Sequence, residues 1–571
     1  MKYAAILLLA GAVMAGGIGH QLTERMESSA PGELIPVSIL VEGDLDQDYV
    51  DAATYGMTRV ERQRFVVAAL KDLAASSQQE IVAFLGQSGA EDVESHWLGN
   101  FVYARASVET IRQAAARQDV WYVEFADPEG GLIEPVDRRP ATPEERSKAI
   151  AWGVDQINAP DVWAMGYEGE GVIVGVIDTG VDYNHSDLGN NMWHDTPAGE
   201  HYGYDFYDGD NDPMDTYGHG THCAGTVAGD GTAGTETGVA PSGIIMALRI
   251  NYYSGGYPTW IEAMEWATDR DVPVLTMSMG TSPVGNATLR EAEEDLLAAG
   301  VYHSVAAGND GPGPGTILAS GDCPPPWFHP DQIYEGGMSA VVTVGATDSG
   351  DNIASFSSRG PVDWWGSVAP WYAYSDSSPL IDPDISGPGV DVLSTQLGGG
   401  YTTMSGTSMA TPHLAGVVAL MLSANPNLTV AQTDSIIEVT SLDLGSSGKD
   451  NTYGAGRVDA YAAVQAALEL TGIAGETGAA LDPAGPVLSR VTPNPVRGAA
   501  GFQLYVPADG QVDITVYDLA GRSVADLESC EMAQGSHSFQ WSLPQDISNG
   551  VYLLRASTPE GSAVTRMTVV R

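Results

Sequence analysis

The feature that most constrains the fold of this chain is a series of continuous apolar runs between residues 152 and 470, separated by segments with helical spacing. Strands buried on both faces are apolar along their whole length, and parallel strands need a long, usually helical, crossover. The pattern therefore predicts an α/β domain built on a buried parallel sheet. The strands are expected at residues 172–177, 244–250, 272–277, 301–306 and 340–344.

Three segments are expected before this domain. Residues 1–20 begin with a positive charge and an apolar run that ends in small residues, which is typical of a secretory signal peptide. Residues 31–130 predict a small α+β domain, and residues 131–151, with several prolines and the pair Arg138 and Arg139, predict an exposed, cleavable linker. In the α+β domain, strands are expected at 35–41, 100–106 and 120–125 and helices at 58–85 and 108–117.

Two segments are expected after the α/β domain. Residues 471–487 are rich in Gly, Ala, Thr and Pro and predict a flexible linker. Residues 488–571 contain short strand-like runs at close spacing with turn signals between them, which indicates an all-β sandwich. These strands are expected at 502–506, 511–517, 537–541, 551–556 and 563–570.

Charge and cysteine content exclude several classes of function. The 571 residues include 74 acidic and 25 basic side chains, a net charge of -49 that argues against nucleic acid or an anionic membrane as a partner. Three widely spaced cysteines offer neither a disulfide framework nor a CxxC metal site. After the leader no stretch reaches 18 unbroken apolar residues, so we expect no membrane span in the mature protein.

Three residues carry the chemistry of a nucleophilic enzyme. Ser408 stands at the start of a predicted helix among small residues, where free backbone N–H groups favour a developing anion. Asp178 follows an apolar strand, at the edge where parallel sheets place their sites, and His219 lies between two glycines. Taken singly, Ser408 is explained as a helix cap, Asp178 as a turn residue and His219 as a core histidine. Together they supply a nucleophile, a base and an orienting acid.

The chain order Asp, His, Ser and four motifs resemble the subtilisin-like serine proteases. The motifs are IDTGVD at 177–182, GHGTH at 218–222, AAGN at 306–309 and GTSMATPH at 406–413. The layout before the domain and the acidic loop before His219 are most similar to the bacillopeptidase F branch. The resemblance implies a three-layer α/β peptidase domain at 152–470 that cleaves peptide bonds through an acyl-enzyme. The competing interpretation is a non-catalytic surface protein that uses a protease fold for binding or adhesion.

The resemblance also implies roles for individual residues. Ser408 attacks the substrate carbonyl, His219 transfers the proton, Asp178 orients the imidazole, and Asn309 completes the oxyanion hole with the Ser408 N–H. The pocket for the residue before the cut is implied at Ser278, Met279, Gly280, Ala307 and Gly308, and an edge strand for the upstream peptide at Ser254, Gly255 and Gly256. Small pocket walls favour a large apolar side chain, whereas the neighbouring Asp310 favours a basic one.

A metal is expected only in a structural role, because the reaction itself needs no cofactor. Asp187 matches a calcium ligand of many subtilisins, although Lys148 stands roughly where those enzymes often have a glutamine ligand. Asp208, Asp210 and Asp212 alternate on a tight loop, which suits Ca²⁺. The alternative is a solvated acidic loop without a metal.

The flanking domains resemble accessory parts of secreted proteases. Residues 31–130 resemble the ferredoxin-like inhibitory prosegment of the family, and the alternative is a permanently attached binding domain. The C-terminal domain resembles the sorting domains of type IX secretion, with a carbohydrate-binding module as the alternative. We therefore expect a self-processing zymogen that is secreted, or attached to the cell surface, and whose partners are protein and peptide substrates, its own prosegment and the secretion machinery.

Overall fold

A computed structural model gives the arrangement of most of the chain. It describes residues 17–43, 45, 50, 53–54, 56–126, 130–194, 202–251, 256–281, 286–319, 321–323, 341–362, 380–474, 487–488, 499–506, 508–518, 523–544, 547, 550–559 and 561–569. The chain forms two compact units, Met1–Leu470 and Thr471–Arg571. Each unit is described separately below.

The first unit contains a parallel sheet of seven strands in the order β15-β14-β13-β11-β8-β10-β9. All five predicted strands are present. The structure adds β9 and β15 at the two edges, which are three and four residues long and carry no apolar run that would have revealed them. The strands are β8 (Ile173–Asp178), β9 (Gly203–Asp205), β10 (Ile244–Arg249), β11 (Val274–Met277), β13 (Tyr302–Ala306), β14 (Val342–Thr347) and β15 (Ile385–Pro388).

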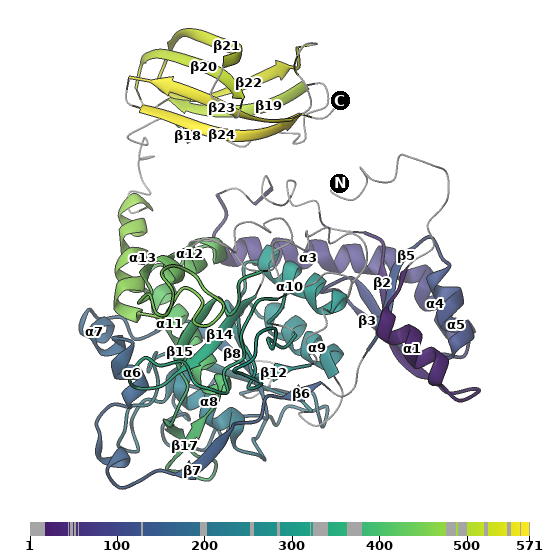
Figure 1. Cartoon of the computed structure of the whole chain (residues 1–571), viewed down its shortest axis with the longest axis vertical. Coiled ribbons are helices and arrows are strands. Elements are labelled where there is room, and N and C mark those ends of the chain that lie inside the picture. The colour runs from purple at the N-terminus through teal and green to yellow at the C-terminus, as the bar shows by residue number, and fades with distance from the viewer. Residues whose placement is uncertain are drawn as a thin grey trace. The chain divides into compact units, whose positions relative to one another are not determined.

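Helices cover both faces of this sheet and make the three layers that the resemblance implied (Figure 1). Successive side chains of a strand point to opposite faces, so Val176 of β8 belongs to one core cluster and Ile177 to the other. On the Val176 side lie α8 (His219–Ala228), α11 (Thr407–Ala424), α12 (Val430–Thr440) and α13 (Ala460–Ala474), and on the other side α9 (Gly256–Thr268) and α10 (Ala287–Ala299). Two short helices, α6 (Trp152–Gln156) and α7 (Ala159–Ala164), precede β8.

Helix α11 is the central helix of the Val176 face. Among the described residues it alone is long and apolar enough to cross a membrane, with a mean hydropathy of 1.3 over 18 residues. Of that window, 89% is buried inside the protein, which is typical of a core helix. Its apolar character therefore reflects packing against β13 and β14, and Ser408 lies in its first turn.

The N-terminal part of this unit is an α+β domain with a five-stranded sheet in the order β1-β5-β2-β4-β3. The predicted helix 58–85 is divided at Gln78, and the unpredicted β3 is largely polar and exposed. Residues 17–28, which overlap the predicted signal peptide, form β1 and α1 in this domain. The elements are β1 (Gly17–Ile18), β2 (Ile35–Val41), β3 (Glu91–His96), β4 (Phe101–Ala106), β5 (Val120–Phe125), α1 (His20–Ser28), α3 (Arg59–Ser77), α4 (Gln79–Gln87) and α5 (Val108–Ala115).

This domain packs on α9 and α10 of the α/β domain. Phe101 from its sheet and Trp260 from α9 share one buried apolar cluster. Glu124 of β5 accepts hydrogen bonds from the backbone N–H groups of Ala287 (3.2 Å) and Thr288 (2.8 Å), so it caps the start of α10. In the other direction, Glu265 of α9 accepts a hydrogen bond of 2.9 Å from the N–H of Leu98. Burial and these hydrogen bonds in both directions hold the two parts in one unit.

The second unit is an all-β sandwich, as predicted. A three-stranded sheet, β18-β19-β22, and a four-stranded sheet, β21-β20-β23-β24, are both antiparallel (Figure 1). Their inner faces share a core that includes Leu504, Ile514 and Leu554. The strands β18 and β21 were not predicted: β18 has two residues, and β21 has no continuous apolar run. The strands are β18 (Val487–Leu488), β19 (Ala499–Val506), β20 (Gly510–Asp518), β21 (Ser523–Met532), β22 (Gly535–Ser542), β23 (Gly550–Thr558) and β24 (Gly561–Val569).

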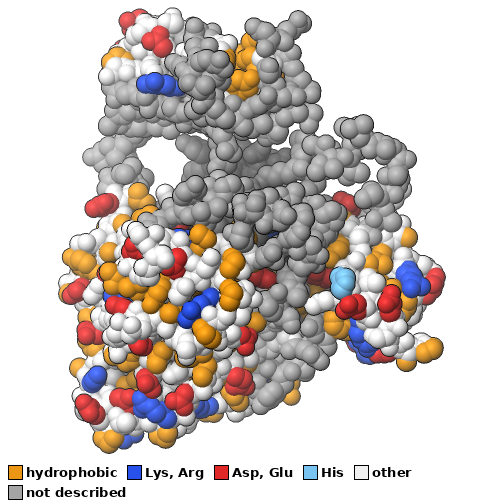
Figure 2. All heavy atoms as spheres, viewed as in Figure 1, with side chains coloured by type: hydrophobic (Ala, Val, Ile, Leu, Met, Phe, Trp, Pro, Cys, Tyr) orange, Lys and Arg blue, Asp and Glu red, His pale blue; other side chains and the backbone are white. Residues whose placement is uncertain are grey.

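The surface reflects the acidic composition. Asp and Glu side chains are scattered over the described part of the face shown in Figure 2, with fewer Lys and Arg among them. This view shows no broad basic patch of the kind that binds a nucleic acid backbone.

Candidate active site

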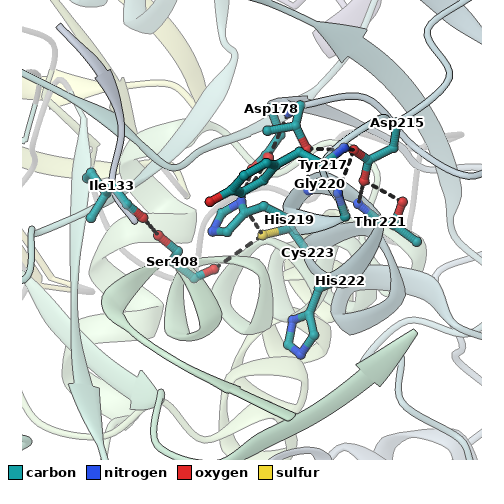
Figure 3. A network of polar contacts seen from close by, with 12 residues as sticks. Ile133, Asp178, Asp215, Tyr217, His219, Gly220, Thr221, His222, Cys223 and Ser408 are labelled. Carbon is teal, nitrogen blue, oxygen red and sulfur yellow. Dashed lines mark hydrogen bonds and ion pairs between the residues drawn. The ribbon is translucent and has the colours of Figure 1, made fainter. Parts of the chain in front are cut away.

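Asp178 and His219 meet at the carboxyl end of the parallel sheet. Asp178 is the last residue of β8, His219 is the first of α8, and both side chains are buried. The Nδ1–H of His219 donates to Oδ1 of Asp178 at 2.8 Å, with Oδ2 at 3.0 Å (Figure 3). This contact leaves Nε2 as the atom that accepts a proton.

The glycine after the histidine makes this contact sterically feasible. A Cβ atom on Gly220 would lie 2.2 Å from the carbonyl oxygen of Gly180 and 3.0 Å from the Cβ of Asp178. Any other residue at this position would push α8 away from the end of β8. The GHGTH motif thus sets the distance between the acid and the imidazole.

The surroundings of His219 change its proton affinity. Burial alone lowers the pKa of His219, but the charge of the Asp178 carboxylate and its hydrogen bond with the imidazole raise the pKa well above its ordinary value. Cys223 lies one turn further along α8 with Sγ 3.7 Å from Nδ1, and burial raises the pKa of its thiol to about 11. Cys223 is therefore a neutral thiol at physiological pH.

The other histidines of the motifs have structural roles. His222 donates from Nε2 to the carbonyl of Val392 at 3.0 Å, and burial lowers its pKa to about 3. His413 donates from Nδ1 to the carbonyl of Met409 at 2.8 Å, and burial lowers its pKa to about 4. Both imidazoles are neutral and buried, so neither competes with His219 as a base.

Ser408 is close to this pair but is engaged by another part of the chain. Its Oγ–H donates to the carbonyl oxygen of Ile133 at 3.0 Å, and Figure 3 shows these groups together with Asp178 and His219. Nε2 of His219 is buried and has no hydrogen-bond partner among the described residues. The hydroxyl proton of Ser408 points at the Ile133 carbonyl. The lone pair on Nε2 of His219 accepts no hydrogen bond from the described residues.

Asn309 lies beside the serine with its amide fixed. Its Oδ1 accepts hydrogen bonds from the backbone N–H and the Oγ1–H of Thr407, both at 3.0 Å. This orientation turns Nδ2 outward as a donor, and it donates to the carbonyl of Glu134 at 2.9 Å. Thr407 therefore orients the amide group, and its donor lies on the Glu134 carbonyl in the described structure.

The residues predicted to bind substrate hold the segment that follows the N-terminal domain. Strand β6 (Gly131–Leu132) pairs antiparallel with β12 (Met279–Gly280), and the N–H of Ile133 donates to the carbonyl of Ser278 at 2.9 Å. The Ile133 side chain is 5% exposed, and a Cβ on Gly280 would lie 3.3 Å from its Cδ1. Ile133 thus packs against the predicted pocket wall.

The structure describes some, but not all, of the other residues predicted to bind substrate. A Cβ on Gly308 would lie 2.8 Å from Cγ of Leu318, which adds an apolar wall residue that the sequence did not reveal. Ala307 belongs to a small buried cluster with Ile317, Val362 and Leu380. Gly256 begins α9, whereas Ser254 and Gly255 lie outside the described residues.

The segment continues past Ser408 as part of a sheet. The N–H of Val136 donates to the carbonyl of Ser405 at 2.8 Å, and β7 (Asp137–Pro140) pairs antiparallel with β17 (Tyr401–Ser405). β16 (Val392–Thr395) completes the three strands. Residues 131–140 of the predicted linker therefore lie across the site in extended pairing, with the Arg138 side chain exposed and that of Arg139 half-buried.

The carboxylates predicted to bind calcium do not converge in the described structure. Asp208 pairs with Arg249 at 2.8 Å, Asp210 accepts from the N–H of Asp212 at 2.9 Å, and Asp212 accepts from the hydroxyl of Tyr183 at 2.7 Å. The described residues form one group of three potential ligands, and that group is Asp178, His219 and Cys223. The acidic loop does not fit a cation as arranged, and no step of the mechanism involves one.

The Asp187 carboxylate also accepts hydrogen bonds from other residues of the chain. It is fully buried, accepts a hydrogen bond of 2.7 Å from the Tyr401 hydroxyl, and accepts another from the N–H of Ala233. These contacts explain a buried carboxylate without an ion. Calcium binding at Asp187 stays a prediction.

Comparisons with known proteins agree with this geometry. The family model "Subtilase family" matches residues 169–456, and the model "Secretion system C-terminal sorting domain" matches residues 490–570. Subtilisin DY of Bacillus licheniformis is 35% identical over 56% of this chain and 100% of its own length. Subtilisin E of Bacillus subtilis is 29% identical over 73% of this chain and 94% of its own length. Bacillopeptidase F of Bacillus subtilis is 31% identical over 72% of this chain and 29% of its own length. The chain belongs to the subtilase family of serine endopeptidases and carries a secretion-system C-terminal sorting domain.

Proposed function

We propose that this chain is the zymogen of a secreted serine endopeptidase in which Asp178, His219 and Ser408 form the catalytic triad and Asn309 the oxyanion hole. One observation carries the proposal: the chain's own Ile133 carbonyl lies against the Ser408 hydroxyl, beside a buried His219–Asp178 pair. A dead protease fold used for adhesion has no need to hold a peptide bond at the serine. The sorting domain accounts for export to the outside of the cell or to its surface.

The reaction follows from the proton positions. Ser408 Oγ attacks the substrate carbonyl carbon and passes its proton to Nε2 of His219, which is free because Nδ1–H donates to Asp178. The Asn309 amide, held by Thr407, and the Ser408 N–H at the start of α11 stabilise the oxygen that becomes negative. The imidazolium then protonates the leaving amine, and water hydrolyses the acyl-enzyme by the same route.

We propose Ile133–Glu134 as the bond that the zymogen presents, because the Ile133 carbonyl accepts from Ser408 Oγ. In the described structure the Asn309 amide donates to the following carbonyl, that of Glu134, so in the reaction this amide must move to the Ile133 oxygen. Pairing of Gly131 with Gly280, together with the hydrogen bond from Ile133 to Ser278, sets the register and brings the Ile133 carbonyl to Ser408. The Ile133 side chain lies against Gly280, so we propose a preference for apolar residues before the cut. Asp310 is exposed, and its described contact is a hydrogen bond from its N–H to the Ser358 hydroxyl, which gives no reason to expect a basic preference.

The N-terminal domain acts as the inhibitor in this proposal. Glu124 caps α10, Glu265 binds its backbone, and the shared apolar core with α9 gives it a broad base on the peptidase domain. From that base the chain leads through 131–134 into the site. The N-terminal domain thereby holds its own peptide where a substrate would bind.

The inhibitory segment is anchored on both sides of the scissile bond. After the bond come the pairing of β7 with β17, the Val136–Ser405 hydrogen bond, and the Arg139 guanidinium, which pairs with Glu145 at 2.8 Å and Asp391 at 2.9 Å. A cut at Ile133–Glu134 leaves this side attached to the enzyme through its own chain, at an effective concentration on the order of millimolar. The new Glu134 amine then stays near the acyl carbon and favours re-formation of the peptide bond.

Labelling with a fluorophosphonate tests the enzyme assignment. We expect the processed wild type to react stoichiometrically, with the probe on the tryptic peptide that contains Ser408, and to hydrolyse a peptide with an apolar residue before the cut. The Ser408→Ala variant, folded as judged by circular dichroism, is expected to do neither. Equal labelling or equal hydrolysis by the two proteins would refute the assignment.

A further inference from the structure

Asp215, four residues before His219, makes the densest set of hydrogen bonds near the site (Figure 3). The side chain is 2% exposed. Its Oδ1 accepts from the N–H groups of Tyr217 and Gly218, both at 2.8 Å, and from the hydroxyl of Thr179 at 2.9 Å. Its Oδ2 accepts from the N–H of Thr221 at 2.9 Å and from the Thr221 hydroxyl at 2.6 Å. One carboxylate thus receives five hydrogen bonds.

These bonds join the two elements that carry Asp178 and His219. Thr179 directly follows Asp178, and its hydroxyl accepts from the N–H of Gly220 at 2.9 Å while it donates to Asp215. Asp215 therefore holds residues on both sides of His219, at 218 and 221, and the residue next to Asp178. The sequence alone does not distinguish Asp215 from the other acidic residues of the loop before His219.

Packing shows that this arrangement has little room to shift. Gly180 has φ +99°, and a Cβ there would lie 2.6 Å from the carbonyl oxygen of Pro213 and 2.9 Å from the N of Asp215. The turn after Asp178 and the loop before His219 therefore touch through their backbones. The Asp215 carboxylate also satisfies N–H groups at the start of α8, where negative charge is stabilising.

We propose that Asp215 is a positioning residue that fixes the distance and orientation between Asp178 and His219. The proposal rests on the assignment of those two residues to the triad. Asp215 contacts neither the substrate segment nor the reacting atoms in the described structure, so it acts through Thr179 and the first turn of α8.

An Asp215→Asn substitution tests this role with almost no change in volume. The amide replaces one acceptor oxygen with a donor, which then faces the N–H groups of either Thr221 or Tyr217 and Gly218 and leaves them unpaired. The first turn of α8 is expected to move, and a misplacement of about 1 Å costs roughly 100-fold in rate. We expect kcat to fall about 100-fold, and KM to change less than about threefold because β12 and Leu318 lie outside the network.

The pH profile provides a readout that a loss of stability does not move. His219 must be neutral to accept the serine proton, and the Asp178 carboxylate opposes burial and raises its pKa. Wild-type kcat/KM should therefore decline as the pH falls through a value above 6.5. This decline is the acid limb of the pH profile. If Asp215→Asn loosens the contact between His219 and Asp178, the pKa of His219 falls and the acid limb moves to lower pH.

Asp205→Asn is the matched control. Asp205 is the last residue of β9, directly before the loop that contains Asp215, and is also buried, at 1% exposure. It also accepts two backbone hydrogen bonds, from Tyr207 at 2.8 Å and Asp208 at 3.0 Å, besides its pair with Arg249. It has no described bond to α8 or to Thr179. We expect Asp205→Asn to lower the melting temperature but to keep the wild-type kcat per active site and the wild-type acid limb.

A second pair of variants keeps the test decisive if Asp215→Asn does not fold. Thr179→Val removes the bridging hydroxyl at nearly constant volume, and Thr179→Ser keeps it. We expect Val to lower kcat at least tenfold and Ser to stay within about threefold of wild type.

All rates refer to full-length protein that has been processed, if necessary by a trace of wild type, and are divided by the number of fluorophosphonate-titrated sites. Wild-type kcat in Asp215→Asn, an unmoved acid limb, or equal rates for the two Thr179 variants would overturn the proposal. An inactive wild type would instead remove the triad assignment itself, so the two failures are distinguishable.

Discussion

Replacing Asp178 with asparagine is expected to lower kcat about 10⁴-fold, a magnitude known for the equivalent change in another Asp-His-Ser protease. The wild-type carboxylate accepts the Nδ1–H of His219, which leaves the lone pair on Nε2. An asparagine amide at this position donates to Nδ1 and shifts the imidazole proton to Nε2. The base then has no lone pair for the Ser408 proton, although the side-chain volume is unchanged.

Steady-state kinetics on titrated, processed enzyme measures this effect. Asp182→Asn is the control, because Asp182 is also buried, accepts from the N–H groups of Asn184 and Gly398, and has no described contact with the His219 imidazole. We expect the control to stay within a few-fold of wild type and both variants to keep a similar KM. An Asp178→Asn enzyme within tenfold of wild type would remove Asp178 from the triad.

The second large effect concerns activation. We expect the appearance of Glu134 as a new N-terminus to precede peptidase activity, and activity to rise about tenfold or more only when residues 134–140 are removed. After the cut, residues 134–140 remain covalently attached to the enzyme, at an effective concentration of roughly 1 mM. They therefore stay bound at the site if their intrinsic dissociation constant is near 100 µM or lower. The strand pairs of β7 and the ion pairs of Arg139 supply this affinity.

Parallel time courses of N-terminal peptides and of hydrolysis of a substrate that spans both sides of the cut test this order. A trace of trypsin, which cleaves after arginine, should accelerate activation of the wild type. In a variant with Arg138→Gln and Arg139→Gln, trypsin should not cleave at positions 138 and 139. This variant also lacks the ion pairs of Arg139, so its activation without trypsin measures how much they contribute to holding the segment. Full activity at the moment of the first cut would show that the segment leaves unaided.

Much of this architecture is predictable from the chain, because the signals are local. β8 and β10 are continuous apolar runs, and Asp178, His219 and Ser408 lie in short motifs with their glycines beside them. Gly220 illustrates why such motifs are recognisable: it is needed where α8 approaches the end of β8.

Other features depend on partners that are remote in sequence. Residues 137–140 contain a proline and three charged residues, which indicate an exposed linker, yet they form β7 because β17, more than 250 residues later, offers an edge. The acidic loop has calcium-like spacing, but Arg249 and Tyr183 reach its carboxylates first. Asp215 is indistinguishable in composition from its acidic neighbours, and only the fold shows which of them faces α8.

The most direct test of the account is mass-spectrometric mapping of the N-termini formed when the purified full-length protein is incubated alone. The account predicts that the wild type cleaves Ile133–Glu134 and that Ser408→Ala, folded and incubated in the same way, stays intact at this bond. It further predicts that a catalytic amount of processed wild type restores cleavage of the variant. Cleavage at Ile133–Glu134 by the Ser408→Ala protein alone, or a wild type that leaves this bond uncut, would contradict the central claim.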